Sequence, residues 1–403
     1  MIAIYLLIFI WKNLDVMRCC LLGIFCLIGM GAPVKGADSL REGVVIHHSP
    51  SNSGRHVGSP SIVVMPDGTY IASHDYFGHF LSDTFVYRSD DKGLTWERIS
   101  TLKTLTWATL FNKGKELYLI GIRSRCTMGY GDFVVCRSDD NDKTWTTPKD
   151  ENTGLIRKGF YHCAPVPVVK RDGKYWRAME NMGKDGGWGP FAALMTSIAC
   201  DGDLLNANEW ILSNELMFRP SWKEGAVAWL EGNAVADKKG DIKDILRVAD
   251  RQDDVAAMAS VSPDGRTLSF DPSTDFIHLP GTAKKFTIRY DRKSKKYWAL
   301  TNYALSDDRL VLSDFGSIRN TQVLICSSDL YNWQIVDTVL TCERPDYYGY
   351  QYVDWQIDGK DIVFVSRTAW RDEYGLPPRQ HDANYLTFHR LKHFRRLADK
   401  QCK

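Results

Sequence analysis

The stretch Ser89-Asp90-Asp91-Lys92-Gly93-Leu94-Thr95-Trp96 decides the fold, because a close copy of it follows at residues 138–145. The copy keeps the pattern S-x-D-x-G-x-T-W except that Asp142 replaces the glycine. Each copy is typical of a tight β-hairpin turn, in which the aspartate caps backbone N–H groups and Gly or Asp tolerates the left-handed conformation. A repeat of this kind predicts a fold made of repeated β units.

Shorter copies extend the repeat. They run over 262–268 and 327–333, and each is one residue shorter than the full pattern. On these motifs the chain resembles the Asp-box propellers, the superfamily of sialidases and related polysaccharide-cleaving enzymes. The resemblance implies an all-β propeller that acts on carbohydrate.

A second periodicity counts the units. Hairpins of similar form, each with an apolar strand, a polar turn and a second apolar strand, lie at 61–75, 107–124, 164–180, 233–250, 285–303 and 350–368. Further strands are expected at 84–88, 132–137, 191–198, 255–261, 322–326 and 384–390. Four strands per unit predict a six-bladed β-propeller of four-stranded antiparallel blades, with seven blades as the alternative count. The segment 43–48 is expected to close the last blade and so to remove an exposed edge.

Composition narrows the class of protein. The 403 residues include 31 glycines and 12% aromatic residues, which suit a folded all-β protein. The formal net charge of +2 lacks the excess of cations that a nucleic-acid partner requires. We therefore expect a carbohydrate partner and no nucleic acid.

Residues 1–36 are expected to be a secretory signal peptide. Met17-Arg18 opens a basic region, an apolar stretch runs over 19–30, and small residues follow near 31–37. The translation start is therefore expected at Met17, and residues 37–403 are expected to form a single propeller domain. A membrane anchor is the alternative, but neither apolar run has the uninterrupted length of a spanning helix. The mature protein is predicted to be secreted or periplasmic, off the membrane and monomeric.

Seven cysteines remain after the leader, and none of their spacings is C-x-x-C. This argues against a zinc knuckle and a redox motif. Most of them lie in apolar runs, where a thiol packs as a small hydrophobic group. The sequence leaves open whether one or two disulfides form.

Propeller topology predicts where the chemistry lies. The loops between the second and third strands of each blade, and those between blades, gather on one face, and here they are rich in Arg, His, Tyr and carboxylates. Guanidinium groups pair with a carboxylate, while Trp and Tyr offer flat faces to sugar rings. The candidate substrate-binding residues are His74, Asp75, Arg123, Glu180, Asn233, Arg247, Tyr303, Arg367, Trp370 and His381.

A sialidase resemblance implies an Arg-Ile-Pro early in the first blade, two further arginines, a Tyr nucleophile paired with Glu, and an Asp acid. Gly58-Ser59-Pro60 stands where the first element belongs. An exo-sialidase is therefore kept as an alternative only.

Four short strings are similar to those of propellers that attack uronate-containing polysaccharides, the rhamnosyl-glucuronic acid hydrolases and related uronate lyases. These strings are His56-Val57-Gly58-Ser59-Pro60-Ser61-Ile62, Ala72-Ser73-His74-Asp75, Tyr161-His162-Cys163-Ala164-Pro165 and Glu231-Gly232-Asn233. The hydrolases of that group use a histidine in place of a carboxylate pair, which this resemblance places at His56.

The candidate catalytic residues are His56, His162 and Glu231. Hydrolysis commonly needs an acid and a base or nucleophile, which Glu180 and Glu231 supply if His56 does not. A uronate lyase needs a base, a cation that holds the carboxylate and a proton donor, and His162 with Tyr303 and Arg123 or Arg247 would serve. Histidine suits either role because its ordinary pKa is close to neutral.

The sequence thus predicts a glycoside hydrolase that cleaves next to an acidic sugar. A uronate lyase, an exo-sialidase and a non-catalytic glycan-binding propeller are the alternatives. No cofactor is expected. No pair of histidines has the spacing of a zinc site. The sequence leaves open whether the fold binds a structural calcium ion.

Overall fold

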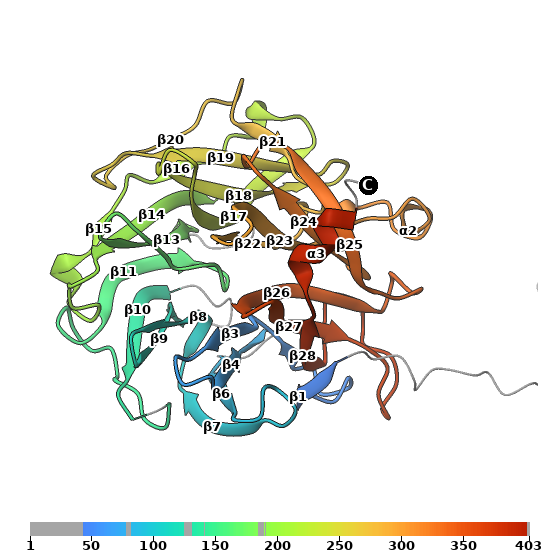
Figure 1. Ribbon diagram of the computed structural model, residues 1–403, viewed down its shortest axis with the longest axis horizontal. Helices are drawn as coiled ribbons and strands as arrows, with labels where there is room; N and C mark the ends of the chain where they lie inside the picture. Colours follow the sequence, from blue (N-terminus) through green and yellow to red (C-terminus); the bar gives the residue numbers. More distant parts are fainter. Residues whose placement is uncertain are drawn as a thin grey trace, which may run out of the picture. The chain divides into compact units, whose positions relative to one another are not determined.

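The part of the chain that the structure describes is built from β-strands. The computed structural model describes residues 43–77, 82–124, 131–140, 142–183, 189 and 191–400. Its helices are short: 3-10 turns at Ala207–Glu209, Pro220–Trp222 and Phe315–Ser317, α2 (Asp308–Val311) and α3 (Phe394–Lys400) (Figure 1). None of the helices in these ranges has the length and apolar character needed to span a membrane. The all-β prediction is confirmed.

The first sheet has four antiparallel strands in the order β3-β4-β6-β7. They are β3 (Ser61–Val64), β4 (Tyr70–His74), β6 (Thr84–Ser89) and β7 (Glu97–Leu102). A two-stranded ladder of β2 (His56–Val57) and β5 (Tyr76–Phe77) lies beside it in sequence. The strand β4 is buried along its whole length, whereas β7 is largely exposed, so burial decreases toward the outer edge.

The second sheet has nine strands, because two runs of the chain join through one short pairing. Tyr161 and His162 of β11 pair with Asn181 and Glu180 of β13. The strands are β8 (Leu105–Lys113), β9 (Glu116–Ser124), β10 (Gly131–Ser138), β11 (Leu155–His162), β12 (Val169–Arg171), β13 (Lys174–Asn181), β14 (Ala192–Ala199), β15 (Ile211–Leu212) and β16 (Leu216–Met217).

Three further sheets complete the fold. One contains β17 (Ala226–Ala236), β18 (Ile242–Asp250), β19 (Val255–Val261), β20 (Leu268–Ser269) and β21 (Phe276–His278). The next contains β22 (Thr287–Asp291), β23 (Lys296–Asn302), β24 (Thr321–Ser327) and β25 (Trp333–Thr341). The last contains β26 (Gly349–Asp358), β27 (Asp361–Ala369), β28 (Tyr385–Leu391) and β1 (Val44–His48).

The six predicted hairpins are all present, as β3/β4, β8/β9, β12/β13, β17/β18, β22/β23 and β26/β27. The prediction that the segment 43–48 completes the last sheet is also confirmed. Strand β1 pairs antiparallel with β28, so the two ends of the described chain share one sheet. This pairing covers the outer edge of β28, which would otherwise be open to a strand of another chain.

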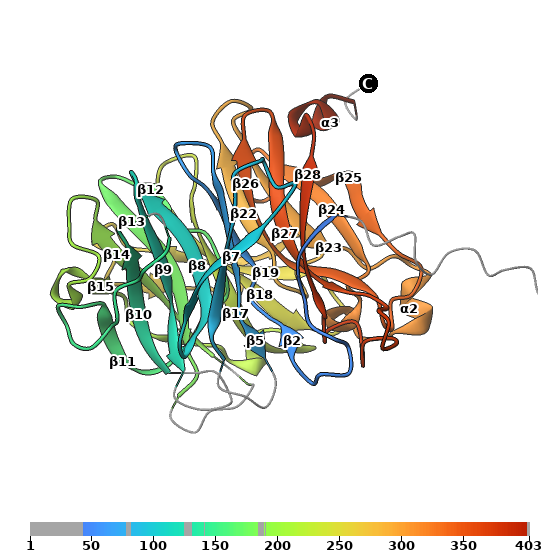
Figure 2. The same cartoon turned by 90° about the horizontal axis from the view of Figure 1, so that it is seen from below.

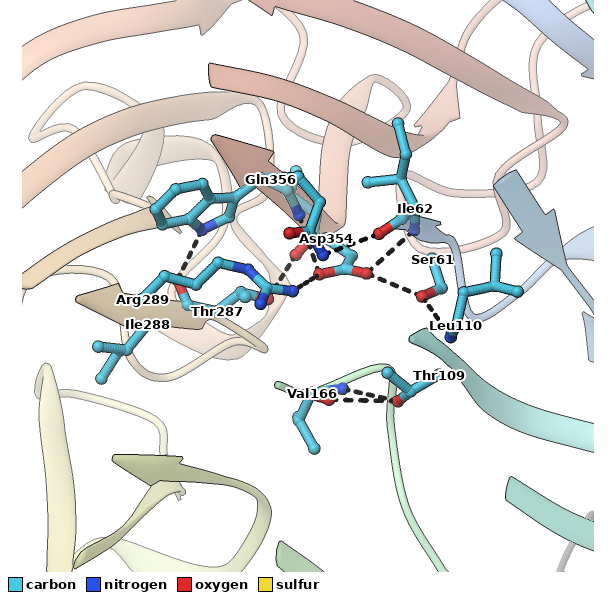
Figure 3. A network of polar contacts seen from close by, with 12 residues as sticks. Ser61, Ile62, Thr109, Leu110, Val166, Thr287, Ile288, Arg289, Asp354 and Gln356 are labelled. Atoms are coloured by element: carbon cyan, nitrogen blue, oxygen red, sulfur yellow. Dashed lines mark hydrogen bonds and ion pairs between the residues drawn. The ribbon is translucent and has the colours of Figure 1, made fainter. Parts of the chain in front are cut away.

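The sheets follow one another around a common centre, and the inner strands β3, β8, β17, β22 and β26 lie closest to it (Figures 1 and 2). A buried polar side chain of an inner strand binds the backbone of the next inner strand or, in one case, Val166 just before β12. These bonds fix neighbouring sheets to one another (Figure 3). Four of these side chains accept a hydrogen bond: Ser61 Oγ from Leu110 N–H (3.0 Å), Thr109 Oγ1 from Val166 N–H (3.2 Å), Asn233 Oδ1 from Ile288 N–H (2.9 Å) and Asp354 Oδ2 from Ile62 N–H (3.0 Å). The fifth, Thr287 Oγ1, donates one to Val353 O (2.8 Å). We call these five side chains the latch residues.

The two repeated turns have the same internal contacts. Asp91 accepts from Thr95 N–H (2.9 Å) and Thr95 Oγ1 (2.6 Å), and Asp140 accepts from the equivalent atoms of Thr144 (2.8 and 2.7 Å). Asp142 has a φ of 75°, the left-handed conformation expected where the other copy has glycine. Local hydrogen bonds thus explain why the motif recurs.

Apolar side chains fill the spaces between neighbouring sheets. Trp229, Trp298 and Trp355 are fully buried, and each indole N–H has an acceptor: Phe191 O, Ser294 Oγ and Thr287 O, at 2.9, 3.0 and 2.9 Å. A buried Trp needs such a partner, because an unpaired N–H is costly in an apolar core. The central residues are therefore held on both sides by rigid packing.

The described cysteines are free thiols: Cys136, Cys163, Cys200, Cys326 and Cys342. The residues from Arg41 to Lys403 belong to one compact unit. The predicted signal peptide, residues 1–36, lies outside the described residues.

Candidate active site

Three inner strands hold a large side chain at a backbone conformation that such residues rarely adopt. Trp107 in β8, Glu231 in β17 and Tyr352 in β26 have φ angles of 54°, 59° and 54°. Each lies where the strand register shifts, so each occupies a β-bulge. A non-glycine residue in this region costs about 1 to 3 kcal/mol, and such residues cluster at functional sites. The three bulges therefore mark a candidate site.

Three arginines surround the side chain of Tyr352. The guanidinium carbon of Arg367 lies 4.4 Å from the centre of the Tyr352 ring, and that of Arg319 lies 5.3 Å from it. Arg247 and Arg319 also make polar contact with the Tyr352 hydroxyl. We call these three arginines and Tyr352 the arginine pocket. A hollow of ≈ 320 Å³ opens beside it, and its lining includes Arg247, Arg319, Tyr352 and His381.

The arginines have hydrogen-bonding capacity to spare. Nε and Nη1 of Arg319 and Nε of Arg367 are buried without a hydrogen-bond partner. Burial lowers the pKa of Arg319 and lowers that of Arg367 to about 10, although the nearby Tyr352 opposes both shifts. A guanidinium is protonated across the physiological pH range, so both groups are cationic at neutral pH. Unpaired buried cations are costly, and an anionic ligand would satisfy them.

Glu231 is the carboxylate of this site. Its Oε2 accepts from Arg247 Nη1 at 2.9 Å, and Arg247 also donates to Ala283 O (3.0 Å). Burial acts to raise the pKa of Glu231, but Arg247 and then His162 outweigh it, so the pKa lies below its ordinary value. Glu231 is therefore ionised at neutral pH. Since Arg247 contacts both Glu231 and Tyr352, it holds the two oxygen functions in one place.

His162 and Glu180 form a second polar pair. His162 Nδ1 is 3.0 Å from Glu180 Oε2, and the other carboxylate oxygen accepts from Gly232 N–H (3.0 Å), next to Glu231. The His162 ring lies between Trp107, 4.4 Å away edge to face, and Phe191, 5.2 Å away and stacked. With Nδ1 bound by the carboxylate, Nε2 is the nitrogen left for a ligand.

Asp75, His56 and His381 lie on the other side of Arg367. Asp75 accepts from Thr106 Oγ1 (2.6 Å) and Trp107 N–H (2.5 Å), and burial raises its pKa. His56 is half-buried, and burial lowers its pKa while Asp382 opposes the shift. Arg367 Nη2 donates to His381 O at 2.5 Å. Arg367 affects the pKa of all three groups, which places them around one guanidinium.

The structure thus brings His56, Asp75, His162, Glu180, Glu231, Arg247, Arg367 and His381 around the arginine pocket. Five other candidate residues have different surroundings. Asn233 is a latch residue, and His74 is fully buried with both ring nitrogens bound, to Asp75 O and Tyr87 Oη.

The remaining three candidates are engaged in packing or ion pairing. Arg123 donates to Asp132 (2.8 Å) and Pro148 O (2.7 Å). Trp370 is buried and stacks on Tyr348 at 4.3 Å, and Tyr303 packs against an apolar cluster. None of these three, nor His74, is kept among our proposed sugar contacts.

Sequence reasoning missed Tyr352, and Arg319 was not among the candidate site residues. The neighbours Tyr350 and Asp354 are buried, Asp354 as a latch residue. The signal that could have found Tyr352 is spacing. Trp107, Glu231 and Tyr352 each precede a latch residue by two positions.

In the described part of the chain, His48, Asp372 and Glu373 form one group whose ligand atoms lie close enough together to hold a metal ion. Asp372 is already bound on both oxygens, by Ser51 N–H (2.8 Å), Ser51 Oγ (2.7 Å) and His48 (2.9 Å). These bonds give the carboxylate a structural role, because they join the end of β1 and Ser51 to the segment that follows β27.

Comparison with known proteins shows the fold. No protein-family model matches the chain, and no curated protein does. Among solved structures, the α-L-arabinanase of Penicillium chrysogenum, complexed with arabinobiose, is similar with a TM-score of 0.52 at 15% identity, covering 87% of this chain and 98% of that one. The α-L-arabinofuranosidase of Fusarium graminearum, also with arabinobiose, gives 0.54 at 13%, covering 87% and 97%.

A sialidase is similar as well. The enzyme of Trypanosoma rangeli, in complex with the inhibitor DANA, gives a TM-score of 0.57 at 14% identity, covering 86% of this chain and 56% of that one. Together with the sheets around a common centre, these likenesses show that the chain has the β-propeller fold of glycoside hydrolases. At these sequence identities the likeness shows the fold alone.

Proposed function

We propose that this protein is a glycoside hydrolase that cleaves the bond to a carboxylate-bearing sugar, a uronate in a polysaccharide or oligosaccharide. The observation that carries the proposal is the arginine pocket. Three guanidinium groups surround one phenol, and buried N–H groups of Arg319 and Arg367 have no partner. A sugar carboxylate supplies the charge and the acceptors that these groups lack.

Glu231 and Tyr352 are the groups we assign to the reacting carbon. The ionised carboxylate of Glu231 stabilises positive charge that develops at this carbon and takes the proton of the attacking water. Tyr352 and the arginines hold the sugar in place. Arg247 sets the distance between Glu231 and Tyr352 because it contacts both.

His162 is the group we assign to the leaving oxygen. Glu180 binds Nδ1, so the Nε2 proton of the imidazolium can pass to the glycosidic oxygen as its bond to carbon breaks. Water then provides the oxygen of the new hemiacetal, and its proton goes to Glu231. His381 lines the hollow beside the pocket, and His56 lies near Arg367.

A sialic acid is the second candidate for the acidic sugar, because the site contains the Tyr and Glu that a sialidase resemblance implies. Gly58 stands where the first arginine was expected, and Arg367 supplies a third guanidinium from a different sheet. This altered geometry favours a uronate over a sialic acid.

The test is a screen of residues 37–403 on uronate-containing polysaccharides and on sialosides. Reducing ends and near-ultraviolet absorbance are read together, since elimination leaves an absorbing unsaturated uronate and hydrolysis does not. Glu231→Gln should abolish release of reducing ends, whereas the exposed Arg266→Ser should not affect it. Absorbing products would assign a lyase instead, and binding without turnover would assign a glycan-binding propeller.

We further propose that the sheets form six blades, with the nine-stranded sheet counted as two. We also propose that residues 1–36 are a leader for export from the cytoplasm and that the mature domain acts as a monomer. The five latch contacts and the six hairpins support six blades.

We also propose that turnover needs no cofactor, because guanidinium groups already provide the positive charge. Dialysis against a chelator should therefore leave the rate unchanged, and a loss restored by calcium would contradict this.

A further inference from the structure

A second hollow lies at the opposite end of the inner strands from the arginine pocket. Its volume is ≈ 490 Å³, and its lining includes Arg171, Lys238, Arg289, Tyr290 and Gln356. Two inner strands, β17 and β26, have residues in the lining of both hollows. In β26, for example, Tyr352 belongs to the arginine pocket and Gln356 to this hollow, and four residues of strand span about 13 Å.

The lining of this second hollow is strongly cationic. It contains five cationic side chains, Lys170, Arg171, Lys238, Arg289 and Arg292, and a single carboxylate, Asp237. Asp237 faces its own turn, where Oδ1 accepts from the N–H groups of Lys239, Gly240 and Asp241 at 2.9, 3.0 and 3.0 Å. The chain as a whole has 51 cationic and 49 anionic residues, so this is a local concentration of charge.

Arg289 is fixed in the floor of the hollow. Its Nη2 donates to the buried Asp354 at 3.0 Å, and Asp354 is held in turn by Ser61 and Ile62 (Figure 3). Nε of Arg289 is buried without a hydrogen-bond partner in the described part of the chain. A guanidinium that is anchored through one nitrogen and still has N–H groups to donate is preorganised for an anion.

An aromatic surface lies beside these cations. Tyr290 is 45% exposed, and its ring centre is 4.9 Å from that of Tyr297, whose hydroxyl donates to Ala236 O at 2.9 Å. A rigid, exposed tyrosine next to fixed cations matches a sugar ring that has a carboxylate. Nucleotide bases would also stack on it, and the test below includes them.

We propose that this hollow is a second, non-catalytic binding site for an anionic oligosaccharide. The choice of a uronate chain as ligand rests on the proposed function, whereas the site itself does not. Such a site would hold a polysaccharide chain on the protein while the arginine pocket acts on another part of it, raising the effective concentration of substrate.

The experiment is a titration with tetragalacturonate, followed by calorimetry at low and high salt. We compare the parent, Glu231→Gln, the double variant Arg171→Ser/Lys238→Ser, the single variant Tyr290→Ala, and the matched control Arg266→Ser/Lys115→Ser, which removes one exposed Arg and one exposed Lys elsewhere. Maltotetraose and a thymidine tetranucleotide serve as the neutral and the nucleic-acid probe.

We expect Arg171→Ser/Lys238→Ser and Tyr290→Ala to weaken one binding event at least tenfold, and Glu231→Gln and the control to leave that event unchanged. Added salt should weaken it as well. Equal binding in the double variant and the control would overturn the proposal, and so would equal or tighter binding of either other probe. If the proposed function fails, turnover is absent but the event sensitive to Arg171 and Lys238 remains.

Discussion

Tyr352 and Arg319 show how much of the site depends on individual side chains. Tyr352 has a left-handed backbone inside a bulge, and Arg319 presents two buried N–H groups without partners. Both features cost stability in the free protein. The packing around them offsets that cost, and a bound carboxylate would recover part of it.

Arg319→Lys is the sharpest test of the carboxylate assignment. Lysine keeps the charge but loses the planar fork, so kcat/KM for a uronate substrate should fall about 100-fold or more. The same substitution should leave cleavage of a substrate with an esterified carboxylate nearly unchanged relative to the parent. An equal loss on both substrates would show that Arg319 does not bind the carboxylate.

Glu180 is a positioning residue, since it acts through His162. Glu180→Gln removes the charged acceptor at His162 Nδ1 and should lower kcat about tenfold to 100-fold with little change in KM. Because Glu180 also binds Gly232 N–H, the thermal midpoint of the variant is measured in parallel. A rise in KM at constant kcat would place Glu180 in substrate binding instead.

The inner strands carry both the bulges and the latch residues, and this explains what could be predicted from sequence. Alternation of apolar residues and Asp/Gly turns located the hairpins, because these are local features. The bulges were not predicted, because one extra residue shifts the alternation of side chains along a strand without changing its composition. In β26 the register shifts between Gln351 and Asp354, and Tyr352 occupies this bulge.

The expected position of His74 was wrong for a related reason. It ends β4 and was placed on the loop that follows, but its ring faces inward and stacks on His47 at 4.7 Å. Distant partners such as His47 cannot be located from local pattern. The predicted candidates Glu231, Arg247 and Arg367 do lie around the arginine pocket, within β17, β18 and β27.

The latch of Asn233 tests how neighbouring inner strands are joined. Asn233→Ala leaves Ile288 N–H and Phe286 O without partners in a buried position, so the free energy of unfolding should fall by about 1 to 3 kcal/mol. Urea unfolding measures it, and the partly exposed Asn112→Ala is the control. A loss no larger than that of the control would mean that the amide does not join β17 to β22.

Closure of the propeller depends on β1, which pairs with β28 and also contacts the first sheet. His47 of β1 stacks on His74 of β4 and lies 2.6 Å from Tyr76 Oη. Burial lowers the pKa of His47 to about 4 and that of His74 to about 3, with smaller contributions from His48 to the first shift and from His47 to the second. Both rings are therefore neutral in the folded protein well below pH 6.

These two histidines predict that the protein loses stability in mild acid. The pKa of each is lower in the folded state than in the unfolded chain, so the unfolded chain binds more protons below about pH 6.5. The free energy of unfolding should be independent of these groups above pH 6.5. It should fall by up to about 1.4 kcal/mol per pH unit for each histidine between pH 6.5 and pH 4.

Chemical unfolding between pH 4 and pH 8 gives the comparison. His47→Phe retains an aromatic ring that can pack on His74 and should flatten the acid part of the curve, while a chain that begins at Ser49 lacks β1 and should unfold more readily at every pH. Since removing β1 leaves β28 as an open edge, this truncated chain should also aggregate. An unchanged pH dependence in His47→Phe would mean that other groups control acid unfolding.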